Sequence, residues 1–164
     1  MSNSTEDIDR VWSLIKEISV AMVVTHSGRG ERMRARPMAA RPARDEGAIY
    51  FLTDANAPKD QEIEHNDNIC LALADNKGQK YLSITGRAEI FDDKDRVKQI
   101  WSAYDAAFWR DENDPRIRIM RVRPESAEYW EGLGAVVSVV KLIAAKLSGE
   151  RVDLGKNEKV GLSP

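Results

Sequence analysis

Residues 32–41 read RMRARPMAAR, in which Arg32, Arg34 and Arg36 are spaced two residues apart. In a β-strand, this spacing places all three side chains on one face of the sheet. Like charges in a row repel one another, so we expect this strand to face an anion. Two interpretations are open: a bound anionic ligand, or a solvated face neutralised by nearby aspartates and glutamates.

The segments on either side of the arginine strand indicate a β-meander. Residues 18–26 (ISVAMVVTH) are apolar and rich in β-branched residues, and residues 48–54 (AIYFLTD) form another such run. The turns SGRG (27–30) and ARDEG (43–47) connect these runs to the arginine strand at short spacing. The sequence therefore predicts three consecutive antiparallel strands.

Three further strands are expected at residues 68–75, 79–91 and 115–125. Within the second of them, Gly86 indicates a bulge or a bend. Residues 135–148 fit either a helix or a strand, because their valines blur the periodicity.

Helical patterns occur at three places. Ser4 and Asp7 resemble a capping box at the start of the first helix. Pro58 suits the first turn of a short second helix, where its missing N–H costs nothing. Residues 92–109 form an amphipathic third helix. Its expected apolar face consists of Val97, Ile100, Trp101, Tyr104 and Phe108.

Six strands with short turns and late helices predict a small antiparallel barrel or sandwich, not a doubly wound sheet. The 164 residues fit one domain, which we place at residues 1–150, with 151–164 as a polar surface tail.

Composition excludes several classes of function. The formal net charge is −2, so no overall basic field attracts nucleic acid or an anionic membrane. The single cysteine, Cys70, excludes an intramolecular disulfide and a cysteine-based zinc site. The first ten residues lack a secretory pattern, and the apolar stretch 135–147 is too short to span a bilayer. We expect a cytoplasmic protein without nucleic-acid or membrane partners.

Catalytic motifs are absent from the sequence. His26 and His65 have no metal-ligand spacing to other ligands, and both suit surface or capping roles. The acidic residues form no obvious catalytic pair. The sequence therefore predicts neither a metal site nor any catalytic residue.

A phosphate site is the best candidate for chemistry. Lys59 lies in the first turn of the second helix, where a cation opposes the helix dipole. An anion held by Lys59, the free N–H groups of the helix and Arg36 would reverse this penalty. Thr53, at the end of the third strand, would add a hydroxyl donor. The small side chains after Arg36 would let a flat ligand approach the backbone.

Six motifs follow one another along the chain: RPMAA (36–40), IYFLTD (49–54), EIEHN (62–66) in the Lys59 helix, SITGRAE (83–89), EYW (128–130) and VDLGKNEKV (152–160). In this order and spacing they resemble the flavin-binding split barrels related to pyridoxamine 5'-phosphate oxidase, and within them the general stress protein group. The resemblance implies a six-stranded antiparallel split β-barrel of Greek-key type with flanking helices. It also implies a homodimer with two flavin mononucleotide (FMN) sites at the subunit interface.

The resemblance further implies a set of cofactor-binding residues. They are Arg36, Pro37, Met38, Ala39, Leu52, Thr53, Lys59, Tyr81 and Trp130. Arg36 and Lys59 would hold the phosphate with help from Thr53, and the backbone after Arg36 would line the isoalloxazine ring, with Leu52 near it. The last two residues would complete the site, with the tryptophan coming from the partner chain. For these two, packing in the core or at an interface is the alternative.

Two departures from the oxidase pattern bear on function. Pro58 stands where the oxidase has an arginine, and GLGAVVSVV (132–140) replaces its substrate-handling arginine and histidine. Pyridoxamine phosphate oxidation is therefore not expected. The resulting hypothesis is a flavin-dependent oxidoreductase with a small-molecule acceptor of unknown identity. The alternatives are a non-catalytic flavin-binding stress protein and a split barrel that binds haem or a deazaflavin.

Overall fold

A computed structural model of the chain describes residues 4–26, 32–55, 57–133 and 155–162. Its strands are β1 (Val20–His26), β2 (Met33–Ala39), β3 (Arg41–Ala43), β4 (Ala48–Asp54), β5 (Asn68–Asp75), β6 (Lys80–Phe91), β7 (Ile117–Gly132) and β8 (Gly155–Gly161). Its helices are α1 (Thr5–Ile18), α2 (Pro58–His65) and α3 (Lys94–Ile100), with the 3-10 turns η1 (Arg44–Glu46) and η2 (Asp105–Ala107). Among the described residues, no helix is long and apolar enough to cross a membrane.

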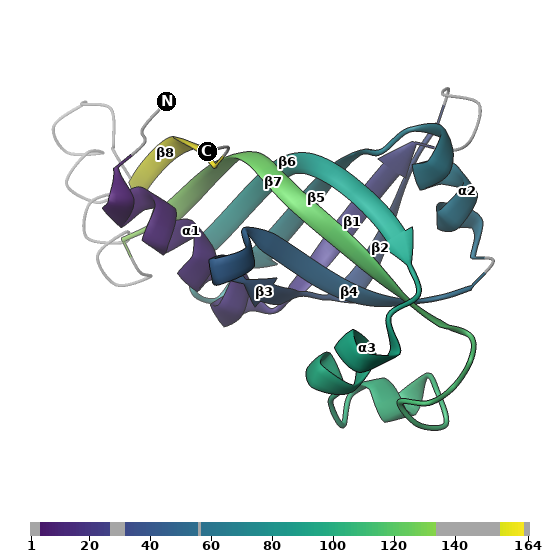
Figure 1. The fold of residues 1–164 in the computed structure, drawn as a ribbon. Helices are drawn as coiled ribbons and strands as arrows, with labels where there is room; N and C mark the ends of the chain where they lie inside the picture. The colour runs from purple at the N-terminus through teal and green to yellow at the C-terminus, as the bar shows by residue number, and fades with distance from the viewer. Residues whose placement is uncertain (1–3, 27–31, 56, 134–154, 163–164) are drawn as a thin grey trace, which may run out of the picture.

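The order of the strands makes the sheet curl into a half-barrel. The strands pair in the order β2-β1-β5-β6-β7-β4-β3, with β8 beside β7, and every pairing is antiparallel. β2 and β3 are the two ends of this path, yet only Ala40 separates them along the chain. The two edges must therefore approach each other (Figure 1). This confirms the predicted antiparallel split barrel, although the predicted strand over 32–41 is broken at Ala40 into two strands.

Helices close the two ends of the barrel. Figure 1 shows α1 at one end and α2 at the other. Val11 and Leu14 of α1 are fully buried in the main core. The predicted cap is confirmed, because the Ser4 hydroxyl accepts a hydrogen bond from the Asp7 backbone N–H at 3.1 Å. α1 extends to residue 18 and ends at Ser19, which is left-handed, so the first strand begins two residues later than predicted.

A second, smaller core packs the segment after α3 against the outer face of β4. β4 is buried along almost its whole length, because one face lines the barrel and the other lies under this segment. The smaller core consists of Ala48, Tyr50, Leu52, Val97, Trp109, Ile117 and Ile119. Its packing holds the residues that follow α3 against the outer face of β4.

The predicted third helix over 92–109 is wrong in length, because α3 ends at Ile100. Trp101 is already extended, and the Asp105 carboxylate accepts hydrogen bonds from the Ser102 backbone N–H and hydroxyl. This local bonding competes with helix continuation. Tyr104 is therefore exposed instead of lying on a buried helix face.

β7 is longer than the predicted strand 115–125, and it includes the EYW motif. The bulge predicted at Gly86 is confirmed by a register shift between Thr85 and Gly86 where β6 pairs with β7. A Cβ atom at Gly86 would lie 2.2 Å from the Arg123 carbonyl oxygen, so no larger residue fits without movement.

The C-terminal segment differs from the predicted surface tail. Residues 155–161 form β8, which pairs with the second half of β7 and brings the described strands to eight instead of six. Val160 is fully buried, but it is the only large apolar side chain of this strand, so the local pattern of residues does not indicate a strand. The segment 135–148, whose structure the sequence left open, lies outside the described residues.

Candidate functional site

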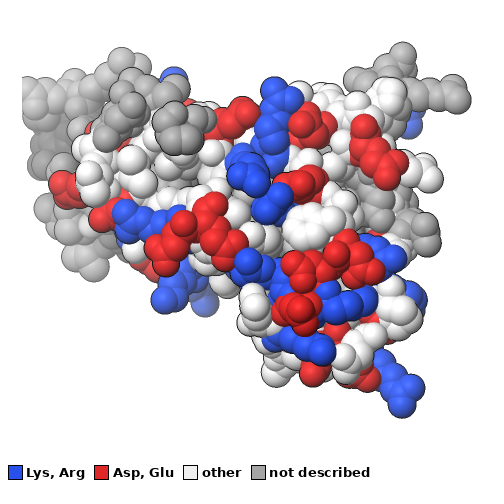
Figure 2. Space-filling view, viewed as in Figure 1, with Lys and Arg blue, Asp and Glu red and all other residues white. Residues whose placement is uncertain are grey.

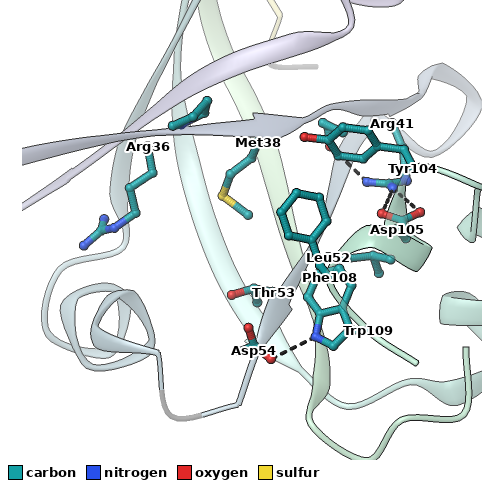
Figure 3. A pocket seen from close by; sticks show the side chains of 12 residues that line it. Arg36, Met38, Arg41, Leu52, Thr53, Asp54, Tyr104, Asp105, Phe108 and Trp109 are labelled. Carbon is teal, nitrogen blue, oxygen red and sulfur yellow. Dashed lines mark hydrogen bonds and ion pairs between the residues drawn. The ribbon is translucent and has the colours of Figure 1, made fainter. Parts of the chain in front are cut away.

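A cavity of about 260 Å³ opens between β2, β3, β4 and the segment after α3 (Figure 3). Six of the nine predicted cofactor-binding residues line it: Arg36, Pro37, Met38, Ala39, Leu52 and Thr53. The other lining residues are Arg41, Asp54, Tyr104, Asp105, Phe108 and Trp109. Strand periodicity and the path of β2 along β4 therefore bring together residues that are far apart in the sequence.

The hydroxyl group of Thr53 is the most unusual polar atom of the cavity. Thr53 is buried at the end of β4, and its Oγ1 has no hydrogen-bond partner among the described residues. A buried polar group without a partner costs about 1–3 kcal/mol. Such a group is expected to bind a ligand atom when the cavity is filled.

Arg36 faces an anion that belongs to the protein. Its guanidinium donates to both carboxylate oxygens of Glu62, at 3.1 and 3.0 Å, and to the Thr25 hydroxyl at 3.0 Å. That hydroxyl donates in turn to Glu62 at 2.7 Å. Arg34 lies farther away, with its Nε 4.0 Å from Glu62. Arg36 thus has a carboxylate partner, as the second interpretation expects, although this carboxylate is buried and not on a solvated face.

Lys59, the second cation of the predicted phosphate site, lies in the first turn of α2, but its side chain is outside the described residues. The helix itself suits an anion. Its N-cap residue, Ala57, makes no side-chain hydrogen bond to the first turn. The N-terminal N–H groups of α2 therefore lack a side-chain cap, and they follow the end of β4 by only a few residues.

Tyr81 and Trp130 lie elsewhere on the chain. They are directly opposite each other in the register of β6 and β7. Both line a second, mostly apolar cavity of about 490 Å³ on the outside of the sheet, together with Val20 and Met22. Neither lines the cavity of Arg36, so one chain does not bring these two residues to the predicted cofactor site.

The sequence did not reveal the wall of the cavity that faces Met38. This wall comes from the segment after α3, and Figure 3 shows Phe108 beside Met38. The sequence placed Phe108 on a buried helix face. One feature of the sequence points to this wall: Arg41 is a single cation among small residues and needs an acidic partner. In the structure that partner is Asp105 of the wall, at 2.6 Å. Neither His26 nor His65 lines the cavity.

Acidic and basic side chains alternate on the surface around α3 (Figure 2). Arg96 of α3 donates to both carboxylate oxygens of Glu46, each at 2.9 Å, and Arg121 of β7 pairs with Glu89. The face shown therefore carries paired charges instead of a continuous basic patch.

A family model, "Pyridoxamine 5'-phosphate oxidase like", matches residues 6–153 of the chain. The chain is also 29% identical over 80 residues to general stress protein 26 of Bacillus subtilis (strain 168). That match covers 47% of this chain and 57% of the relative, so it spans little more than half of the relative's length.

Solved structures share the fold at low sequence identity. A candidate general stress protein 26 from Jannaschia sp. CCS1 is 20% identical, with a TM-score of 0.74 over 96% of this chain and 99% of that chain. A protein related to general stress protein 26, from Clostridium acetobutylicum, is 16% identical, with a TM-score of 0.69 over 96% of both chains. The general stress FMN/FAD binding protein of Xanthomonas citri is 23% identical, with a TM-score of 0.67 over 78% of this chain and 90% of that chain.

Proposed function

Because the chain belongs to the pyridoxamine 5'-phosphate oxidase-like family, we propose that it binds flavin mononucleotide in the cavity between β2 and β4. One structural neighbour is named an FMN/FAD binding protein. The observation that carries the proposal is the buried Thr53 hydroxyl, which lines the cavity and has no partner among the described residues. A ring with polar edge atoms would give this hydroxyl the hydrogen bond that it lacks.

The cavity offers separate surroundings for the ring and for the phosphate. The backbone of Pro37 to Ala39, with Leu52, supplies a surface for the flat ring. Arg36, Lys59 and the N-terminal N–H groups of α2 are the proposed phosphate ligands. A bound flavin would supply hydride or electron transfer, and these residues would orient it and exclude water.

The ion pair with Glu62 reduces the positive charge with which Arg36 can attract a phosphate. Three of the guanidinium's hydrogen bonds go to Glu62 and Thr25, so the pair is nearly neutral and its orientation is fixed. The Nε–H of Arg36 donates to no described residue. We therefore propose that Arg36 positions the phosphate through directional hydrogen bonds, while the N–H groups of α2 and Lys59 supply most of the attraction.

The second part of the proposal is a homodimer whose site needs both chains. Ligand pockets that bury a drug-sized molecule typically have volumes of about 300–1,000 Å³. The cavity of one chain, about 260 Å³, falls short of this range. Tyr81 and Trp130 lie on an outer apolar surface, from which they would reach a flavin only across a subunit interface.

Oxidoreductase activity on an unknown small-molecule acceptor is the proposed chemistry. The lining residues include no histidine and no lysine, and both lining arginines have carboxylate partners. Hydride transfer needs no protein acid or base at the reacting atoms, whereas proton abstraction does. The same observation supports a non-catalytic flavin-binding protein as the second candidate. Anaerobic reduction of the bound flavin by a nicotinamide cofactor would separate the two.

The binding proposal is tested by titrating the protein with FMN and with riboflavin, following the quenching of flavin fluorescence. Thr53→Val keeps the shape of the side chain and removes only the hydroxyl, so affinity for both flavins should fall about three- to tenfold.

Lys59→Met should weaken binding of FMN by about tenfold or more and leave riboflavin binding nearly unchanged. Arg34→Met, on the same strand face, is the control for a general loss of charge. Wild-type protein that binds neither flavin would overturn the proposal.

A further inference from the structure

Two aromatic side chains of the cavity remain exposed although their backbone is held in place. Tyr104 and Phe108 are 55% and 59% exposed, and their ring centroids lie 5.2 Å apart. Figure 3 shows Phe108 next to Met38, with Trp109 of the same segment hydrogen-bonded to Asp54 at the end of β4. Exposed apolar surface beside a cavity often marks a binding site.

Hydrogen bonds fix the segment that carries these rings. Arg41 donates to the carbonyl oxygens of Ile100, at 2.9 Å, and Ala39, at 3.0 Å. It also donates to Asp105, which lies between the two aromatic residues in the chain. The indole N–H of Trp109 donates to the Asp54 carboxylate at 2.8 Å. The backbone that carries the two rings is thus already ordered. A ligand that stacks on the rings would therefore bind with little loss of backbone entropy.

Both positive charges that line the cavity have a carboxylate partner. Its charged lining residues are two arginines and two aspartates. Arg36 is paired with Glu62 at 3.0 Å, and Arg41 is paired with Asp105 at 2.6 Å. The remaining carboxylate, that of Asp54, accepts a hydrogen bond from the indole N–H of Trp109. An anion entering beside these groups would lose its hydration without gaining a free positive charge. The aromatic wall is therefore suited to an uncharged ligand.

We infer that Tyr104 and Phe108 form a stacking surface for a second ligand, an uncharged planar aromatic molecule. The inference rests on the proposed function, since the flavin ring would occupy the opposite wall along β2. Stacked or tilted aromatic pairs contribute beyond the area they bury, and the tilt of 52° between the two rings leaves both edges and faces available. The second ligand would then lie between the flavin and the segment after α3, at the open side of the cavity, where both rings are exposed.

The test uses two planar probes that differ in charge: 2-naphthol, which is uncharged at neutral pH, and naphthalene-2-sulfonate, which is anionic. Each is titrated calorimetrically into the protein with and without FMN. We expect 2-naphthol to bind at least about tenfold more tightly than the sulfonate to the FMN-loaded protein. The double variant Tyr104→Leu with Phe108→Leu should lose about tenfold or more in 2-naphthol affinity. Its FMN affinity should stay within about twofold of the wild type.

The ring-preserving double variant Tyr104→Phe with Phe108→Tyr is the matched control and should bind 2-naphthol like the wild type. Equal binding of both probes, or unchanged 2-naphthol affinity in the leucine variant, would overturn the inference. A tenfold loss of FMN affinity in that variant would also overturn it, because the rings would then hold the flavin itself. Should the protein bind no flavin, the proposed function fails, while the titration without FMN still decides whether this wall binds the planar probe. Each single leucine variant gives the same comparison if the double variant does not fold.

Discussion

At the scale of single residues, the pair of Arg36 and Glu62 explains why a cationic strand can face the inside of a barrel. Arg36 lies opposite the fully buried Val23, so its side chain points to the core face of β2. Glu62 projects from α2, which covers this end of the barrel, and the Thr25 hydroxyl bridges the two. A buried ion pair contributes little net stability, but removal of one partner leaves an uncompensated charge.

Glu62→Ala should therefore destabilise the protein by about 2–4 kcal/mol, somewhat less than for a fully buried pair because Arg36 is partly exposed. Glu62→Gln should cost less, since an amide still bonds to Arg36 and Thr25. Urea unfolding at neutral pH measures both values, with Glu64→Ala on the exposed side of the same helix as the control. If Glu62→Ala and Glu64→Ala unfold at the same urea concentration, the pair has no role in stability.

Strand periodicity made much of the site predictable. Arg36, Met38 and Thr53 reach one cavity because each lies at a strand position whose direction follows from alternation. The Glu62 carboxylate was not predictable in the same way. Its distance from Arg36 depends on how far the sheet curls and on where α2 settles, and neither is encoded by local spacing.

At the scale of elements, ion pairs fasten α1 to the end of the barrel. Arg10 of α1 donates to Glu131 of β7 at 2.8 Å and, within the helix, to Glu17 at 2.7 Å. Glu17 also accepts from Lys80 of β6 at 2.7 Å. The bond to Arg10 lowers the pKa of both carboxyl groups below their usual range. A carboxyl group with a lowered pKa in the folded state stabilises the protein above its ordinary pKa, near 4.3. This stability is lost as the pH falls through the lowered value.

Arg10→Met should lower the free energy of unfolding at pH 7 by about 1 kcal/mol, because the pairs are partly exposed. The difference from wild type should persist down to about pH 5 and then shrink as the two carboxyl groups become protonated. Urea unfolding at a series of pH values between 7 and 3 measures it. Lys77→Met, in the exposed turn between β5 and β6, should give no such pH-dependent difference. A difference that stays constant to pH 3 would contradict the role of these carboxyl groups.

Elements with a strong local pattern were predictable, and elements defined by their partners were not. AIYFLTD is apolar throughout, and it forms β4, which is covered on both faces. The amphipathic pattern over 92–109 failed because Asp105 bonds within its own turn and to Arg41. β8 had no local signal, since its place is set by the unpaired edge of β7 and by one buried valine.

At the scale of the whole molecule, the curl of the sheet leaves one apolar face that the described helices do not cover. α1 and α2 close the barrel ends, and the segment after α3 covers β4 (Figure 1). No described helix or loop covers the outer faces of β1, β5, β6 and β7 around the apolar cavity. Their exposed large side chains include Val20, Met22, Tyr81 and Trp130. A contiguous apolar patch of this kind commonly marks a protein–protein interface.

Met22→Lys places a charge in the middle of this face and should convert the proposed dimer into a monomer. A lysine there would have to be buried without a partner against the apolar surface of the second chain. Sedimentation velocity at low micromolar concentration measures the mass of the particle. Met33→Lys is the control, because Met33 on β2 is also an exposed methionine but does not line the apolar cavity. The monomeric variant should also lose about tenfold or more in FMN affinity, since it lacks the partner's share of the site. A Met22→Lys protein that sediments like the wild type would remove this face as the interface, and a monomer with full FMN affinity would show that one chain suffices for the cofactor.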